Sequence, residues 1–509
     1  MFQGKPASGK GSALPAALYT TALCGFIVAS RWPLAPRHLY YFDSANFAYA
    51  LERFDPALHQ PQPPGYPLFV ALTRLIHFWV VRPEEVFLIA GLLAACAATA
   101  LMRVLAGDMF GRTAGILAAT LLASNPTFWF GGITNEIRTF LALSTTGVAL
   151  LAWRALSRPD EPRWFYAACA ALGVAAGFRP VESVLLSLIL VWVWFQTGRS
   201  TRRLVLGLTA LALMVAPWLI AVLFAVGGVH PFTSLLWQYA LAQFSGTSAA
   251  FGATRGAAWH MFAEAVVWNF LGALAWIWAL PFLPRIRPDR RKAAFLAVLF
   301  LPFFLFSAFI HIGDPDQALG SIPVLSVVGG AVLAAVLERW NSRRIIRMAC
   351  AVIVIHMIIF FHPPGKLARA SSYRAAKDVD FMTNRALDSI EALDKKGPLT
   401  IVHYGSSVGS RQVSYYFPDD YVVILPGSPQ HPALGQPVQL YYHHLPLPAP
   451  PPGTKEPMLA GSRGVVCLLP WNDDGKELAS WQKSGSVYYH PVSSTPILVG
   501  PYTFSAGKP

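Results

Sequence analysis

The segment Tyr40–Phe69, "YYFDSANFAYALERFDPALHQPQPPGYPLF", places an acid among aromatic side chains and then continues into a proline-rich turn. It begins shortly after an apolar run over residues 13–32. Proline is tolerated in the first turn of a helix, so Pro63–Pro67 predicts a stiff turn that opens a helix. The segment therefore predicts a structured loop that folds back onto the apolar part of the chain.

The composition of the chain is that of a membrane protein. Hydrophobic residues make up 54% of the 509 residues and charged residues 13%, with a mean hydropathy of +0.45. A soluble protein carries about a quarter charged residues. The net charge of +14 comes largely from short basic clusters between apolar runs, such as residues 197–203 and 285–292. Such clusters mark cytoplasmic loops and exclude a nucleic-acid groove, which would interleave basic and aromatic residues on a soluble surface.

Apolar runs of about 17–25 residues predict about eleven membrane spans. They lie near residues 13–32, 86–106, 113–131, 135–156, 164–179, 181–196, 203–226, 265–284, 293–310, 319–338 and 345–362. With a cytoplasmic N-terminus and an uncleaved first span, the Arg- or Lys-containing loops near residues 107–112, 157–163, 197–203, 285–292 and 341–344 all fall on the cytoplasmic side. The location predicted for the protein is the bacterial inner membrane.

This topology requires that residues 66–80, within a first outer loop over residues 33–85, do not cross the membrane. The run is short and is interrupted by Arg74 and His77, which is typical of a helix lying in the membrane interface. Residues 1–362 are thus predicted to form a membrane domain. Residues 363–509 are predicted to form a soluble α/β domain outside the membrane, because "LTIVHYG" and "YVVIL" alternate like strands and "DFMTNRALDSIEAL" is amphipathic.

Asp43 is the first candidate for chemistry. An acid beside the bilayer and surrounded by rings is costly to keep charged without partners, and partial burial would raise its pKa toward values useful to a general base. The alternative from the residues alone is a helix N-cap, because a helical run follows directly.

Two further charged residues fall at the outer ends of spans. Glu136 could hold a metal ion or share acid–base work with Asp43, or it could follow a cap formed by Asn135 or Thr134. Arg179, between two spans, could bind an anionic group such as phosphate. Its alternative partner is Glu182, three residues later, in a helical ion pair.

Two outer loops supply the remaining polar candidates. The segment "VHPFTSLLWQYALAQFSG" adds His230, Trp237, Gln238 and Tyr239 as candidates. The alternative is that its rings form an aromatic belt at the membrane interface. The segment "HIGDPDQALGSIP" contains His311, Asp314 and Asp316, and acids in such a turn are normally solvated, with metal ligation as the alternative.

No nucleotide-binding loop, dinucleotide fingerprint, serine-hydrolase elbow or zinc helix occurs in the sequence. The motif "DSANF" followed by "QPPGYPLFVAL" resembles the membrane-embedded GT-C glycosyltransferases. Within that superfamily it is similar to the protein O-mannosyltransferase-like branch and to the aminoarabinose transferases of lipid A. Weaker similarity continues through "NPTFWFGGITNEIRTFLAL", "GVAAGFRPVESVLL" and "DPDQALGSIPVLSVVGG", so that it covers about residues 13–362.

The resemblance implies an inverting transfer of a sugar from a polyprenyl-phosphate-linked donor to an acceptor hydroxyl at the outer membrane face. The acceptor would be a glycan, protein or lipid. It implies that Asp43 is the base and Glu136 the second acid, with a divalent cation, if one is used, held by these two. For the donor phosphate it implies Arg179, assisted by His311 or Arg255.

The resemblance also implies that the acceptor or other substrate groups contact the first outer loop, through Tyr41, Asn46, His59, Gln62 and Tyr66. Two residues depart from the family pattern. Asn46 stands where the branch often has a second acid, and Gln62 stands where it has a histidine, with His59 as a stand-in. The alternatives to a transferase are a transporter of lipid-linked sugars and a non-catalytic scaffold of the cell envelope.

Overall fold

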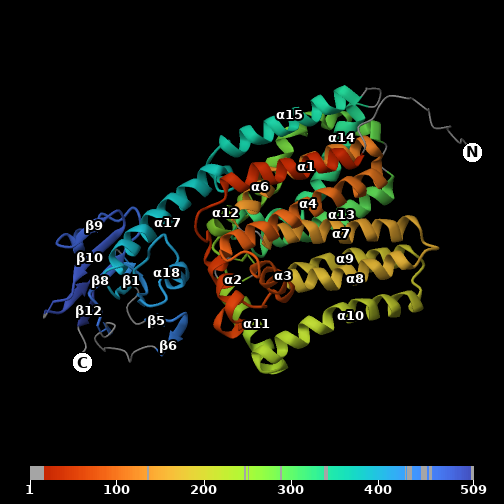
Figure 1. The fold of residues 1–509 in the computed structure, drawn as a ribbon. Helices are drawn as coiled ribbons and strands as arrows, with labels where there is room; N and C mark the ends of the chain where they lie inside the picture. Colours follow the sequence, from red (N-terminus) through yellow and green to blue (C-terminus); the bar gives the residue numbers. More distant parts are fainter. Residues whose placement is uncertain are drawn as a thin grey trace, which may run out of the picture.

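The computed structural model describes residues 16–134, 137–245, 248–249, 251–286, 289–337, 342–429, 431–432, 438–448, 456–457, 461–493 and 495–505. These residues form a bundle of long helices with a smaller sheet-containing domain at one end (Figure 1). Helix α17 (Tyr373–Asp394) runs from the bundle into the C-terminal domain. The predicted fold class, a polytopic helical membrane protein with a C-terminal α/β domain, is confirmed.

Most predicted spans correspond to a helix whose bounds agree within a few residues. These are α1 (Ala16–Arg31), α4 (Pro83–Phe110), α7 (Ile137–Ser157), α8 (Arg163–Phe178), α9 (Pro180–Gln196), α10 (Thr201–Val226), α13 (Arg290–Phe309), α14 (Ile322–Val336) and α15 (Ser342–Phe361). Within the described residues, five helices are long and apolar enough to cross a membrane, and up to seven if two bent pairs each count as one span. The count of eleven spans stays a prediction.

The two bent pairs replace the predicted spans 113–131 and 265–284. Helices α5 (Arg112–Ser124) and α6 (Pro126–Thr134) meet at 48°, because the residue before a proline is disfavoured in helical conformation and Asn125 is extended. The Asn125 side chain accepts hydrogen bonds from the backbone N–H groups of Thr127 and Phe128 and so caps α6. The second pair, α12 (Arg255–Phe270) with η3 (Leu271–Ala275) and then η4 (Ile277–Ile286), bends by 72°.

The first outer loop is ordered into short helices between α1 and α4. They are η1 (Trp32–Leu34), α2 (Phe42–Glu52), η2 (Pro56–Leu58) and α3 (Pro67–His77). Helix α3 has 11 residues and is about 16 Å long, roughly half the thickness of a hydrocarbon core. Helices α2, α3 and α11 (Val229–Phe244) lie at the end of the bundle that faces the C-terminal domain (Figure 1). The turns from α7 to α8 and from α9 to α10 lie at the opposite end.

The C-terminal domain is built on a seven-stranded sheet of order β6-β5-β2-β1-β8-β10-β9. The central strands β2 (Tyr421–Ile424), β1 (Thr400–His403) and β8 (Gly464–Leu468) are parallel and buried, which confirms both strands predicted from alternation. The edge strands β5 (Gln439–Tyr442), β6 (Leu445–Leu447), β10 (Val487–Pro491) and β9 (Gln482–Ser484) are antiparallel. Helix α17 contains the predicted amphipathic segment, and helix α18 (Ser410–Tyr416) connects β1 to β2.

The remaining elements are short. They are α16 (Lys366–Arg369), η5 (Pro315–Gly320), η6 (Lys476–Leu478), the pair β3 (Gly427–Ser428) and β4 (His431–Pro432), and a small sheet of β11 (Ile497–Val499), β12 (Tyr502–Ser505) and β7 (Glu456–Pro457). Of these, η5 matters for function because it follows α13 and carries Asp316.

Candidate active site

Asp43 lies in the first turn of α2, where the helix dipole favours a negative charge. The N-cap of this helix is Tyr41, and no side chain caps it. The interpretation of Asp43 as the N-cap is therefore wrong. Asp43 is half-buried beside Arg138 and Arg179.

Arg138 and Asp316 form the centre of the buried charged cluster. The Asp316 side chain is fully buried, and its Oδ1 lies 3.4 Å from Nε of Arg138, which is the second residue of α7. Helix α6 makes room for this pair, because Gly131 packs directly on Asp316: a Cβ atom at Gly131 would lie 2.9 Å from the Asp316 Cβ atom. Among the residues that the structure describes, neither carboxylate oxygen of Asp316 has a hydrogen-bond partner.

Glu182 joins the two arginines of the cluster. Its Oε1 lies 3.5 Å from Nη1 of Arg138 and also accepts a hydrogen bond from Nη2 of Arg179. Arg179 thus forms the ion pair with Glu182 that the helical spacing predicted as the alternative to phosphate binding. Its guanidinium also lies over the Tyr66 ring, 5.4 Å from the ring centroid. Arg179 therefore contacts an aromatic ring as well as a carboxylate.

The cluster holds more acids than bases, because Asp43, Asp314, Asp316 and Glu182 share two guanidinium groups. Burial raises the pKa of Asp316 to about 7, although Arg138 opposes this. Burial also raises the pKa of Asp314, opposed by Arg138 and by a hydrogen bond from Tyr41. The pKa of Asp43 is raised by burial, opposed by Arg138 and supported by the charge on Asp314. Asp316 is therefore suited to hold or take a proton near neutral pH, and Asp43 and Asp314 hold a proton more readily than exposed carboxyl groups do.

Two further side chains border the cluster from other loops. His311 is half-buried, and burial together with Arg138 lowers its pKa to about 4, so that it is a neutral donor at pH 7. Tyr239 of α11 contacts the ring of His59 at 5.9 Å between centroids. Burial raises the pKa of Tyr239, and the charges on Tyr66 and Asp43 raise it further. The aromatic belt stays a prediction for this segment.

The structure places other predicted site residues as follows. Asn46 is fully buried, and its Oδ1 accepts a hydrogen bond from Arg411 of the C-terminal domain at 2.9 Å. Gln62 is buried in the proline-rich turn, and its Oε1 has no partner among the described residues. Arg255 is exposed in the first turn of α12, and no described contact joins it to the cluster. Their substrate-binding roles stay predictions.

Glu136 lies outside the described residues, so its pairing with Asp43 stays a prediction. Over the described ranges no three His, Cys, Asp or Glu side chains gather into a group that could hold a metal ion. A divalent cation held by Asp43 and Glu136 therefore stays a prediction.

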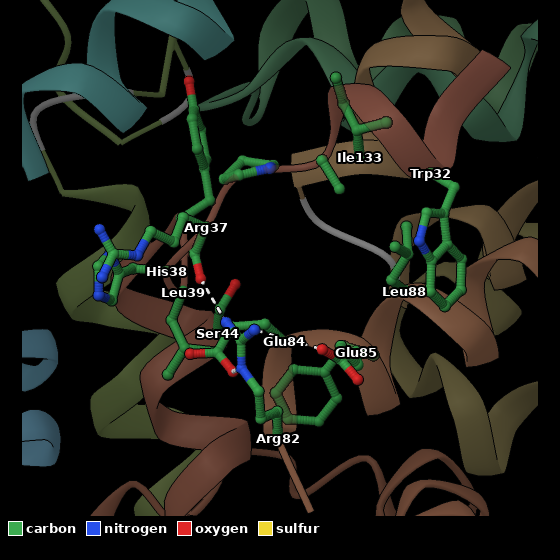
Figure 2. Close-up of a pocket in the computed structure, with 14 residues that line it drawn as sticks. Trp32, Arg37, His38, Leu39, Ser44, Arg82, Glu84, Glu85, Leu88 and Ile133 are labelled. Atoms are coloured by element: carbon green, nitrogen blue, oxygen red, sulfur yellow. Dashed lines mark hydrogen bonds and ion pairs between the residues drawn. The ribbon is translucent and has the colours of Figure 1, made fainter. Parts of the chain in front are cut away.

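A cavity of about 180 Å³ opens beside the N-terminal end of α2 (Figure 2). Ser44, next to Asp43 in the chain, lines it together with apolar groups such as Trp32 and Leu88. Arg82 crosses its floor, donating from Nη2 to the Arg37 carbonyl at 3.0 Å and from Nη1 to Glu85 at 3.3 Å. Arg82 is therefore paired, and the cavity is lined by charged groups of both signs, Arg37 and Glu84 among them, as well as by apolar groups.

Sequence reasoning did not assign Arg138, Asp314 or Asp316 to the site. All three lie within segments that carry the family resemblance, and Asp314 and Asp316 were expected to be solvated in their turn. The available signal was their position: Arg138 and the "DPD" turn each lie directly at the outer end of an apolar run. A charged side chain at the end of an apolar run lies close to the bilayer and needs a partner of opposite charge.

These features define the class of protein: a polytopic helical membrane protein whose first outer loop, α7 and η5 together build a buried acid–arginine cluster at one end of the bundle. Comparison with known proteins identifies the fold. A family model described as dolichyl-phosphate-mannose-protein mannosyltransferase matches residues 61–223, which include Arg138 and Arg179 but not Asp43. No curated protein gives a significant match.

Two crystal structures of ArnT from Cupriavidus metallidurans are similar over most of both chains. The apo state is 15% identical, covers 93% of this chain and 98% of that chain, and has a TM-score of 0.59. The state bound to undecaprenyl phosphate is 15% identical, covers 81% and 93%, and has a TM-score of 0.57. The chain therefore has the fold of a GT-C glycosyltransferase, and the resemblance predicted from "DSANF" and "QPPGYPLFVAL" is confirmed.

Proposed function

We propose that this chain is an inverting glycosyltransferase that moves a sugar from a polyprenyl-phosphate-linked donor to an acceptor hydroxyl at the outer face of the membrane. The observation that carries the proposal is the half-buried Asp43 beside the Arg138–Asp316 pair, in a fold shared with ArnT. One of the ArnT structures is bound to undecaprenyl phosphate, a polyprenyl phosphate like the carrier that the proposed donor would release.

In the proposed reaction the acceptor hydroxyl attacks the anomeric carbon from the face opposite the phosphate. Asp43 takes the hydroxyl proton, a new carbon–oxygen bond forms, and the bond from the anomeric carbon to the phosphate oxygen breaks. Polyprenyl phosphate leaves with an added negative charge, so it needs no general acid. Arg179, held by Glu182, supplies positive charge to that phosphate, and the neutral His311 can donate one hydrogen bond.

The position of the charges favours this proposal over a transporter. Arg138 is the second residue of α7, and Arg179 separates α8 from α9, so both lie at the ends of helices. A transporter of lipid-linked sugars would place such groups near the bilayer midplane, on helices interrupted there. At the two helix breaks the polar groups instead have local partners: Asn125 Oδ1 accepts from the Thr127 N–H group, and the Trp276 N–H group donates to the Ala273 carbonyl.

The proposal includes an orientation in a bacterial inner membrane, with the N-terminus in the cytoplasm and the C-terminal domain outside. It is supported by the basic loops near residues 157–163 and 197–203, which lie at the end of the bundle opposite that domain. The cluster would then face the side where nucleotide-sugars are absent and lipid-linked donors are present. The acceptor would be a glycan, a protein or a lipid on that side.

The experiment is mass spectrometry of envelope glycans and glycoproteins from a deletion strain, complemented with variants of the full chain. A sugar lost in the deletion strain names the donor and acceptor class. Asp43→Asn should fail to restore it at normal protein levels, and the matched control Glu52→Gln, an exposed acid of the same helix, should restore it. Full restoration by Asp43→Asn would remove Asp43 as the base, and an unchanged glycan profile would count against a transferase.

A further inference from the structure

Helix α18 of the C-terminal domain contacts the first outer loop through one buried arginine. Arg411 is 2% exposed, and its Nε donates to Oδ1 of Asn46 at 2.9 Å. Its Nη2 donates to the carbonyl oxygens of His59 at 3.2 Å and Leu58 at 3.4 Å. One planar guanidinium therefore joins α2 to the end of η2, two parts of the loop that are twelve or more residues apart in sequence.

The partners of Arg411 are neutral. Its guanidinium lies 4.3 Å from the centroid of the Tyr49 ring, and no described salt bridge joins Arg411 to a carboxylate. A buried cation with neutral partners depends on hydrogen bonds and ring contacts for its solvation. Lysine would keep the charge, but its ammonium lacks the planar fork that reaches Asn46 and both carbonyl groups at once.

The same helix also holds the residues just before Asp43. Gln412 donates from Nε2 to the carbonyl oxygens of Leu39 and Tyr40, the second at 3.1 Å. The Tyr416 hydroxyl accepts a hydrogen bond from the Leu39 N–H group at 2.8 Å and donates to Glu84 at the start of α4. The chain that enters α2 is thus held by α18 on one side, and the next turn of α2 is held by Arg411.

We infer that α18 is a positioning element of the proposed transferase, with Arg411 as its central residue. Asn46 follows Asp43 by one helical turn, so the bond from Arg411 fixes the rotation of α2 about its axis. A fixed rotation would hold the Asp43 carboxylate in one position relative to Arg138, whose charge acts on it. The bonds to Leu58 and His59 hold the entry of the proline-rich turn, whose Tyr66 lies against Arg179. The C-terminal domain is then part of the catalytic machinery, acting through the first outer loop.

This inference rests on the proposed function, and its test separates the two. The full-length protein would be assayed in membranes with polyprenyl-phosphate sugars of the class found in the deletion strain. Arg411→Lys should lower kcat/KM on the order of 10- to 100-fold, since displacing a catalytic group by about 1 Å can cost that much. It should also move the acid limb of the pH–rate profile, which a loss of folded protein would not do. Glu52→Gln removes an exposed contact with His444 at the same interface and should leave both unchanged.

Hydrogen exchange of the same proteins gives a readout that does not need activity. Arg411→Lys and, separately, Gln412→Ala should speed amide exchange in residues 43–52, while exchange in α4 and α7 stays at the wild-type rate. Faster exchange in this loop supports the positioning role even if no donor is turned over, in which case only the proposed function fails. Wild-type exchange and wild-type kinetics in both variants would overturn the inference.

Discussion

Arg138 and Asp316 pair inside the molecule, with Arg138 Nε 3.4 Å from an Asp316 oxygen and no exposed surface on the carboxylate. They come from α7 and η5, which are separated by more than 170 residues. Arg138 also reaches Glu182 at 3.5 Å, so that one guanidinium balances two acids from different elements. Arg138 therefore connects α7 with η5 and α9.

The first prediction concerns the stability of this pair. Arg138→Met should destabilise the protein by about 3–5 kcal/mol, because it leaves two acids buried without their cation. The double variant Arg138→Met with Asp316→Leu should be less destabilised than the sum of the two single variants, since no charge of the pair then stays unpaired. Denaturant unfolding of the purified protein in detergent measures both. Additive effects would show that the two side chains do not interact.

The second prediction concerns the space that Gly131 leaves for Asp316. Gly131→Ala should lower transfer activity about tenfold, because the new methyl group would force η5 away from α6 and move Asp316 from Arg138. Gly147→Ala is the matched control in α7, where an added Cβ atom would make an ordinary contact 3.6 Å from Leu101. The readout is kcat/KM at equal protein levels. Equal activity of the two variants would mean that the site tolerates displacement of η5.

The third prediction is a pH dependence of stability in the C-terminal domain. Asp420 accepts a hydrogen bond from the Leu399 N–H group at 2.8 Å, and burial raises its pKa to about 7. Because the folded state binds the proton more tightly than the unfolded chain, stability should fall as the pH rises from about 4 to about 7. Asp420→Asn keeps the acceptor and removes the charge, so it should stabilise the protein by about 2 kcal/mol at pH 8.

Thermal unfolding of the full chain at pH 5 and pH 8 checks this sign. The gain from Asp420→Asn should be larger at pH 8 than at pH 5. Asp419→Asn, the exposed neighbouring acid, is the control and should change the midpoint little at either pH. A gain that is equal at both pH values would mean that Asp420 does not titrate in this range.

The helices of the bundle could be predicted because a run of apolar residues is a local property. The predicted span 164–179 and helix α8 (Arg163–Phe178), for example, differ by one residue at each end. The break in the span 113–131 had a local signal in Pro126, but its capping by the Asn125 side chain depends on the bend itself. Asp43 was found because its aromatic setting and the proline-rich turn lie close together in sequence.

The partners of Asp43 could not be predicted in the same way. Acids in a turn such as "DPDQ" are usually solvated, and only the packing of η5 against α6 and α7 buries Asp316. The contact of Arg411 could not be predicted from the sequence either, because its partner Asn46 is 365 residues away. Such pairings depend on the tertiary structure and leave no periodic pattern.

The last prediction tests whether Asp43 is the group that titrates during catalysis. A general base must be ionised, so kcat/KM should be lost as the pH falls through the pKa of Asp43, which burial raises above its ordinary value of 3.8. The charge on Asp314 raises this pKa and the charge on Arg138 lowers it. Asp314→Asn should therefore move the acid limb of the profile to lower pH, and Arg138→Gln should move it to higher pH.

These opposite shifts identify the base more sharply than loss of activity does, because a general loss of folded protein would lower the whole profile without moving its limb. Arg53→Gln, which removes an exposed arginine paired with Asp55 in the same loop, is the control and should leave the limb in place. If neither Asp314→Asn nor Arg138→Gln moves the limb while both retain measurable transfer, a group other than Asp43 takes the acceptor proton.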